Sequence, residues 1–197
     1  MAFAVFLLER SFEVRGQRED ERRLEEGRRH EARQQAQFLT ALRDDLSGVD
    51  LRGRDLSGFY LRGKRLSDAD LEAAILFGAN LARADLTGAV LRGANLRGAH
   101  MEAAILQGAD MEGADLRKAF LQRADLRQAS LDEAELGEAD LRQADLRGAS
   151  LVQGKHLGDA DLRGASFDEG QGGTLWPEGF DAEAAGALLS GKQQEAP

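Results

Sequence analysis

The stretch ADLRQADLRGASL, residues 139–151, repeats an Ala and a Leu every five residues. The Leu positions continue in steps of five from Leu46 to Leu151, interrupted only by Met101 and Met111. The residue two places before each of them is always Ala over positions 69 to 149. A period of five is therefore the dominant signal in this chain.

The period of five excludes the regular helix and the straight strand. A helix turns about 100° per residue, so a step of five spreads the Leu side chains around all of its faces. In a strand, an odd step sends successive Leu side chains to opposite sides. A chain that turns a corner within every five residues points each Leu at one central axis. The period thus predicts a solenoid, whose units bury their apolar faces by stacking on neighbours.

The other repeat positions fit such a solenoid, if the central Leu is called position i. Ala at i−2 is small because it also points inward. Asp, Asn or Ser at i−1 is expected to hydrogen-bond the backbone of a turn. Gly at i+2 permits corner conformations that other residues adopt at a cost. The expected axis includes Leu86, Leu106 and Leu126 with Ala84, Ala104 and Ala124.

This A-(D/N)-L-x-x pattern resembles the pentapeptide-repeat family over about residues 44–168. The resemblance implies an all-β solenoid, namely a right-handed quadrilateral β-helix with four pentapeptides in each coil. The segment Gln153–His156 adds one residue to the pattern, which resumes at Leu157. We interpret this insertion as a single bulged corner.

The first repeats depart from Ala at i−2, where Asp44, Val49, Arg54, Phe59 and Lys64 stand. Burying an unpaired charge is costly. We therefore expect the first coil to be partly open, or its long side chains to reach solvent.

Two flanking segments complete the predicted domain organisation. Residues 1–43 combine an apolar start, residues 1–8, with a charged α-helical arm. Residues 169–197 form a short C-terminal cap and tail, in which Trp176 and Phe180 are expected to close the axis. Residues 182–190 are expected to form a short helix.

The sequence lacks the convergent groups that catalytic chemistry needs. His30, His100 and His156 have no spacing typical of metal ligands. The segment Gly186–Lys192 matches the G-x-x-x-x-G-K spacing of a phosphate loop, but Gln193 replaces the Ser or Thr that holds Mg²⁺, so we interpret it as a frayed tail. We expect a non-enzyme with no metal, no cofactor and no small-molecule substrate. The chain has no Cys, which is typical of a reducing compartment, and we expect a cytoplasmic protein.

Outward positions sorted every 20 residues predict two oppositely charged sides. One is acidic and is the candidate interaction face. Its carboxylates are Asp50, Asp70, Glu72, Asp110, Glu112, Asp132 and Glu133, against Arg52 and Arg92. The opposite side is basic and presents Arg62, Arg83, Arg123 and Arg142 against Glu102 and Asp140.

Three functions remain open. The first is a non-catalytic, rigid protein–protein interaction or structural module with an unidentified protein partner. The second, implied by the resemblance, is a DNA mimic that binds a type II topoisomerase, gyrase or topoisomerase IV, and protects it from poisons. The acidic face and the net charge of −9 favour this mimic, whereas the basic side and the lack of a clear dimerising C-terminal helix count against it. The third is a membrane-tethered scaffold, if residues 1–8 belong to a longer helix. The acidic balance argues against direct nucleic-acid binding.

Overall fold

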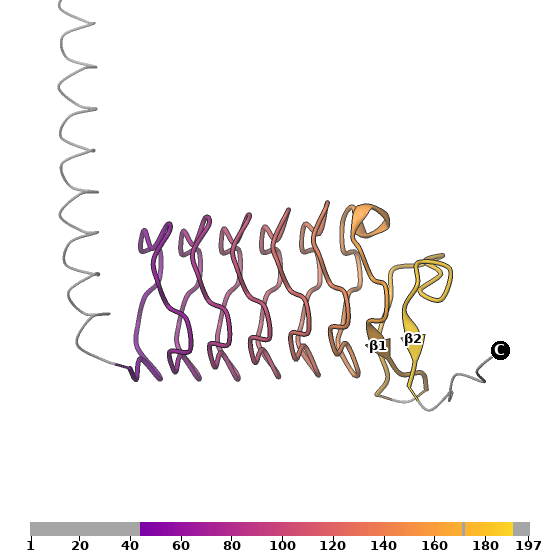
Figure 1. Cartoon of the computed structure of the whole chain (residues 1–197), viewed down its shortest axis with the longest axis horizontal. Helices are drawn as coiled ribbons and strands as arrows, with labels where there is room; N and C mark the ends of the chain where they lie inside the picture. The colour runs from indigo at the N-terminus through magenta and orange to yellow at the C-terminus, as the bar shows by residue number, and fades with distance from the viewer. Residues whose placement is uncertain (1–43, 171, 191–197) are drawn as a thin grey trace, which may run out of the picture. The chain divides into compact units, whose positions relative to one another are not determined.

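The computed structural model describes residues 44–170 and 172–190, which lie within one compact unit. The apolar start and the helical arm expected over residues 1–43 lie outside the described residues. Parallel bridges join residues that are 20 apart, from Asp45↔Arg65 to Glu135↔Lys155. Each coil therefore contains four pentapeptides, and successive coils stack along one axis (Figure 1).

One repeat, Asp85 to Ala89, shows how the backbone is satisfied. The N–H groups of Asp85, Leu86 and Gly88 donate to carbonyls of the neighbouring coils at 2.7 to 3.0 Å. The N–H of Ala89 donates to the carbonyl of Leu86 at 3.0 Å and closes the turn. The remaining N–H, that of Thr87, donates to Oδ1 of Asp85 at 3.1 Å. All five backbone donors are thus paired, as burial in a stack of coils requires.

The expected role of position i−1 is confirmed where that residue is Asp or Asn, but Ser130 and Ser150 accept no such bond from the described residues. The N–H of residue i+1 donates to the i−1 side chain in repeats from Asp45 to Asp161. Asn80 and Asn95 make the same bond through their amide oxygens. The carboxylate or amide therefore accepts the one backbone donor that the ladder between coils leaves over.

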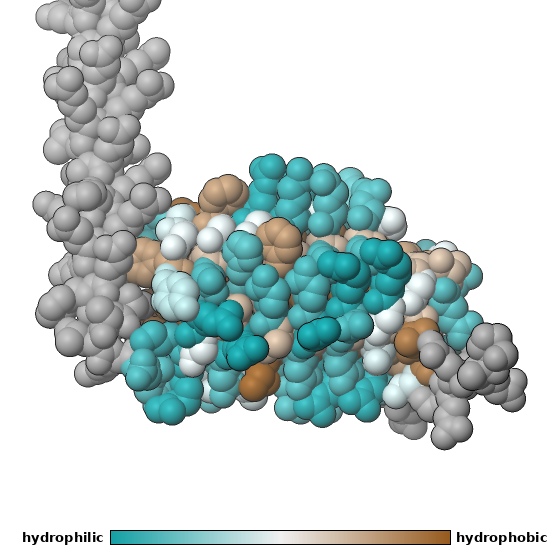
Figure 2. All heavy atoms as spheres, in the orientation of Figure 1, coloured by the Kyte–Doolittle hydropathy of each residue, from teal (hydrophilic) through white to brown (hydrophobic). Residues whose placement is uncertain are grey.

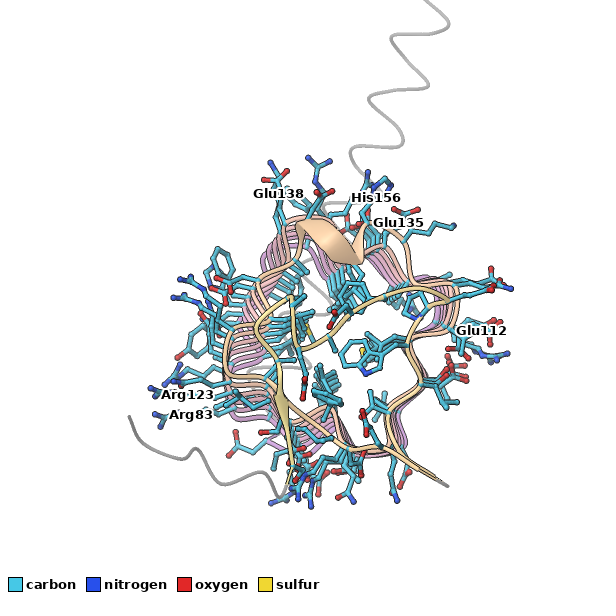
Figure 3. The ribbon with its side chains drawn as sticks, turned by 90° about the vertical axis from the view of Figure 1, so that its right-hand side faces the viewer. Arg83, Glu112, Arg123, Glu135, Glu138 and His156 are labelled. Carbon is cyan, nitrogen blue, oxygen red and sulfur yellow. The ribbon has the colours of Figure 1, made fainter. Side chains whose placement is uncertain are left out.

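Apolar side chains fill the axis, as the view along it shows (Figure 3). Leu86, Leu106 and Leu126 have no exposed surface. The Ala at i−2 is equally enclosed, with an exposed fraction of 1% at Ala124 and 0% at Ala104. In the coils that have Ala at i−2, a larger side chain would therefore overfill the space inside.

The first coil is open in the way that its departures from Ala require. Arg54 is exposed and Val49 is half-buried, whereas Phe59 is buried. The ammonium of Lys64 forms an ion pair with Asp44. No charge at these inward positions is therefore both buried and unpaired.

The inserted residue produces the predicted bulged corner. The bridge Asp140↔Asp161 spans 21 residues instead of 20. The corner contains a 3-10 turn, η1 (Leu157–Asp159), preceded by His156 in the left-handed conformation at φ 57°. Leu157 is buried, so the axis continues past the insertion.

The C-terminal segment extends the wall of the solenoid. β1 (Ser166–Phe167) pairs in parallel with β2 (Leu188–Leu189), and Leu175 bridges Ser150 of the preceding coil. The helix expected over 182–190 is wrong, because turns lead into β2 there. The N–H of Leu188 donates to the carbonyl of Ala165 at 2.7 Å, which occupies a strand edge that would otherwise be open.

Candidate interaction surfaces

Four columns of outward side chains run along the solenoid, one for each side of the coil. We call the side with Glu112 the acidic face; it comprises the outward residues of the repeats centred on Leu51, Leu71, Leu91, Met111, Leu131 and Leu151. We call the opposite side the basic face; its repeats are centred on Leu61, Leu81, Met101, Leu121, Leu141 and Leu162. Glu112 points outward on one side, and Arg83 and Arg123 point outward on the other (Figure 3).

Arginines cross-link part of the acidic face. The guanidinium of Arg52 lies 2.8 Å from Asp50 and 3.3 Å from Asp70, one coil further on. Arg92 lies 2.7 Å from Asp110 and also hydrogen-bonds Glu112. The face is thus a ladder of ion pairs with an excess of negative charge.

The remaining carboxylates of the acidic face are differently placed. Asp132 accepts a hydrogen bond from Oγ of Ser150 at 2.6 Å. Glu72 and Glu133 are exposed. In the first coil of this face, the hydrogen bond from Arg52 lowers the pKa of Asp50 to about 2. Asp50 is therefore ionised at neutral pH.

The basic face contains a hollow of about 750 Å³. Nine residues line it. Four of them are Gln122, Gln143, Glu102 and Ala103, and the other five are the arginines Arg62, Arg83, Arg123, Arg142 and Arg163. The short side chain of Ala103 lies among these long ones and leaves room for the depression. The sequence grouped four of the five arginines, but it indicated neither Arg163 nor the hollow.

The arginines of the hollow fall into two groups. Arg142 and Arg163 form two-pronged ion pairs with the Asp two residues earlier, at closest distances of 2.6 Å. Arg123 donates from Nε to Oε1 of Gln143 at 2.8 Å. Among residues 44–170 and 172–190, the side chains of Arg62 and Arg83 have no partner. The hollow therefore presents free guanidinium groups.

Two buried oxygen atoms in the hollow also lack partners. Oε2 of Glu102 and Oε1 of Gln122 accept no hydrogen bond from any described residue. The other carboxylate oxygen of Glu102 lies 3.2 Å from Nδ1 of His100. Both atoms belong to residues that line the hollow, and buried polar atoms without partners are costly.

Apolar side chains on the outside are scattered. His100 and Phe120 stack on the basic face with ring centroids 4.7 Å apart, and Tyr60 of the same column is 66% exposed. The side seen in Figure 2 is mainly hydrophilic, with isolated apolar groups. Charge rather than apolar area therefore distinguishes the faces.

The inserted corner carries a small charged cluster. Nε2 of His156 lies 3.7 Å from Glu135 and its Nδ1 lies 3.9 Å from Asp159. Lys155 lies 3.5 Å from Glu135. His156 and Glu135 lie close together in the axial view (Figure 3). In the part of the chain that the structure describes, no group of three side chains is arranged to hold a metal ion, and His30 lies outside it.

The segment with phosphate-loop spacing has another role where it is described. Leu188 and Leu189 form β2, and Ala187 is buried. The interpretation as a frayed tail is therefore wrong for residues 186–190, which complete the last coil. Lys192 and Gln193 lie outside the described residues.

A four-sided solenoid with a 20-residue coil is what pentapeptide repeats build, and the comparisons agree. This chain belongs to the pentapeptide-repeat family, whose members fold as right-handed quadrilateral β-helices. The family model "Pentapeptide repeats" matches in 8 copies over residues 45–81, 65–102, 94–132, 109–148 and 124–155. Together these matches span more than half of the chain. The predicted family is thus confirmed.

Similar solved structures are also pentapeptide-repeat proteins. HetL, involved in heterocyst differentiation regulation in the cyanobacterium Nostoc sp. strain PCC 7120, is 31% identical, with 73% of this chain and 71% of that chain covered and a TM-score of 0.40. Rfr23 from Cyanothece 51142 is 26% identical, with coverages of 71% and 95% and a TM-score of 0.39.

A third similar structure is a trypsin-treated form of QnrB1, a plasmid-mediated fluoroquinolone resistance protein. It is 25% identical, with coverages of 72% of this chain and 81% of that chain and a TM-score of 0.37. No curated protein sequence matches this chain. Because the TM-scores are low, the family assignment rests on the repeats themselves.

The prediction of membrane attachment concerned residues 1–8, which lie outside the described part. Over residues 44–170 and 172–190, no helix has the length and apolar character that a membrane span needs.

Proposed function

We propose that this chain is a non-catalytic interaction module that presents two oppositely charged faces to protein partners. The observation that carries this proposal is the contrast between the acidic face and the basic face on opposite sides of one hydrogen-bonded stack. Backbone bonds between the coils fix the spacing of every outward column, so little conformational entropy is lost on binding. Such preorganisation favours affinity.

Charge gives these faces their selectivity. An acidic partner surface matches the free guanidinium groups of Arg62 and Arg83, because arginine donors fit carboxylates in a two-pronged geometry. A basic partner surface matches the carboxylates of Glu72 and Glu133. Both contacts are steered over a distance and weaken as salt rises.

Photo-crosslinking in the source cell tests this proposal. A benzophenone amino acid replaces Glu133 on the acidic face, Ala103 in the hollow or, as a control on a neighbouring side, Arg97. We expect protein adducts from position 133 or 103, identified by mass spectrometry, and few from position 97. Equal labelling from all three positions, or no protein adduct from any, would contradict the proposal.

The second candidate is the DNA mimic that binds a type II topoisomerase. It is favoured by two carboxylate pairs, Asp70/Glu72 and Asp110/Glu112, which occupy equivalent positions two coils apart. At about 4.8 Å per coil they are about 10 Å apart along the axis. Arg92 neutralises part of the second pair, so the acidic face is a weaker imitation of a phosphate backbone than the sequence indicated.

A supercoiling assay with purified gyrase and topoisomerase IV separates the two candidates. The DNA mimic requires that the chain changes supercoiling at low salt. It also requires that reversing Asp70, Glu72, Asp110 and Glu112 to Lys abolishes the effect without changing the circular dichroism spectrum. An unchanged assay with the wild-type chain excludes the mimic and leaves the interaction module intact.

A further inference from the structure

The acidic face changes sign along the axis. Its second coil carries Asp70 and Glu72, and its fourth coil carries Asp110 and Glu112. In the third coil, which lies between them, Arg92 is the only charged outward residue on this face. From the second to the fourth coil, the formal charge of the face therefore runs negative, positive, negative.

The basic face changes sign at the same coil. Arg83 and Arg123 are the charged outward residues of its second and fourth coils. In the third coil, Glu102 is the charged residue that lines the hollow. The sequence of signs is therefore positive, negative, positive, which is the complement of the acidic face at each of the three coils.

We infer that the basic face of one copy of this chain binds the acidic face of a second copy, side by side, parallel and in register. Two copies necessarily share the same coil spacing, because the same hydrogen-bonded ladder sets it. In register, Glu72 is level with Arg83, Arg92 with Glu102, and Glu112 with Arg123. This inference names a partner for the interaction module proposed above and so rests on that proposal.

Arrangements of the same two faces that are shifted by one coil bring like charges together. A shift of one coil in one direction sets Arg92 level with Arg123, and a shift in the other sets it level with Arg83. Antiparallel packing that aligns the two third coils gives the same pairs at the centre, but it then opposes the unpaired Arg83 to the already cross-linked Asp110 and Glu112. Antiparallel packing about the middle of the six coils pairs the third coil with the fourth and sets Arg92 level with Arg123. Like charges in contact oppose association, so the signs select the parallel register over these shifted ones.

Unused bonding capacity supports this pairing. Arg92 donates within its own chain from Nε and Nη2, which leaves the Nη1 donors for a partner. The side chain of Glu102 is 41% exposed, and among the described residues it pairs only with His100 and with no arginine. The side chain of Arg83 is without a partner there. The hollow of about 750 Å³ provides space for side chains that project from the second copy.

The contact uses opposite sides of each copy. A basic face and an acidic face remain free at the two edges of any dimer, so association continues into rows of parallel solenoids. Such a head-to-tail contact does not close into a symmetric dimer. We therefore expect species larger than a dimer as the concentration rises.

Sedimentation of the full-length purified chain tests the inference. We expect association at low ionic strength that disappears at about 0.5 M salt, because the Debye length falls to a few ångströms. Arg92→Glu and Glu102→Arg each oppose two like charges and should weaken association about tenfold or more. The double variant restores an attractive pair with its sign exchanged, and association should recover.

Arg97→Glu is the matched control. Arg97 lies in the same coil and at the same repeat position as Arg92, but on a neighbouring side. It should leave association unchanged, with circular dichroism and melting temperature reported for every variant. A chain that stays monomeric at low salt overturns the inference, as does a double variant no better than the weaker single one. Neither result bears on photo-crosslinking to a different protein, so the proposed function would still stand on that separate test.

Discussion

The ammonium Nζ of Lys64 lies 2.7 Å from Oδ1 of Asp44, and the two residues occupy the same inward repeat position of successive coils. The side chain of Lys64 is only 15% exposed, whereas that of Asp44 is 93% exposed. The next residue in this column, Ala84, is completely buried. The ion pair therefore marks the place where the open first coil gives way to the closed axis.

Lys64→Ala restores the residue that the later coils have at this position. We expect its melting temperature to equal or exceed that of the wild type, because the variant removes a mostly buried charge together with its need for a partner. Asp44→Asn should lower the melting temperature more than Lys64→Ala does, since it leaves the ammonium without its anion. Thermal unfolding followed by circular dichroism gives the order, and the reverse order would contradict this account.

Ala109→Leu tests the packing of the axis. Ala109 has no exposed surface. Overpacking a closed interior costs about 1–3 kcal/mol. Arg97→Ala, at an exposed site in a neighbouring coil, should change the free energy of unfolding by about 0.5 kcal/mol or less. Urea unfolding measures both variants, and equal midpoints would show that i−2 does not limit the volume of the axis.

The repeat itself was readable from sequence because one rule operates at every coil. A step of five with Leu at i and Ala at i−2 has one compact solution, so the solenoid and its insertion near His156 followed from spacing. The C-terminal segment was misread because its pairing is set by the last coil. Composition over 182–190 favours a helix, but Gly186 adopts φ 90° and Leu188 finds an open strand edge. Tertiary pairing overrode local propensity there.

The charge of the faces was also predictable, whereas their fine structure was not. Column membership follows from the 20-residue coil, so an acidic and a basic side emerge from counting. The bridging of Asp110 and Glu112 by Arg92 depends on side-chain conformations between coils. The hollow depends on the combination of short Ala103 with long neighbours. Residue spacing encodes neither of these, although a search for small residues within charged columns would have indicated the hollow.

Acid should destabilise the solenoid through the carboxylates at i−1. Hydrogen bonds from Arg52 and Arg163 lower the pKa values of Asp50 and Asp161 to about 2 from a model-compound value of 3.8. A carboxylate with a depressed folded-state pKa stabilises the fold above its unfolded pKa, and this contribution is lost as the pH falls through the folded one. The melting temperature should therefore fall between about pH 4 and pH 2.

A triple variant, Asp115→Asn with Asp125→Asn and Asp145→Asn, isolates this effect. All three carboxyls have pKa values lowered chiefly by hydrogen bonds from arginines, at Arg117, Arg127 and Arg147. An amide oxygen keeps the turn bond, as Asn80 does, but it does not titrate. The variant should melt lower at pH 7 and lose less on acidification. A decline as steep as that of the wild type would locate the acid sensitivity elsewhere.

Trp176 is predicted to close the C-terminal end of the axis. Its ring meets Phe167 edge-on, with centroids 5.7 Å apart, and it lies 5.3 Å from the ring of Phe180. Trp176→Ala uncovers Phe167 and should cost about 2 kcal/mol, less than the 3–5 kcal/mol of a fully buried aromatic residue. Trp176→Phe should cost less, because Nε1 of Trp176 has no hydrogen-bond partner among the described residues.

Light scattering in high salt provides the decisive measurement for this cap. An exposed axis end promotes apolar end-to-end association, which about 0.5 M salt does not screen, unlike contact between charged faces. Trp176→Ala should therefore self-associate at that salt concentration while the wild type and Trp176→Phe remain monomeric. Since Trp176 is the only tryptophan in the chain, its fluorescence in the wild type also reports this end alone. If Trp176→Ala stays monomeric and as stable as the wild type, the axis is closed by other residues.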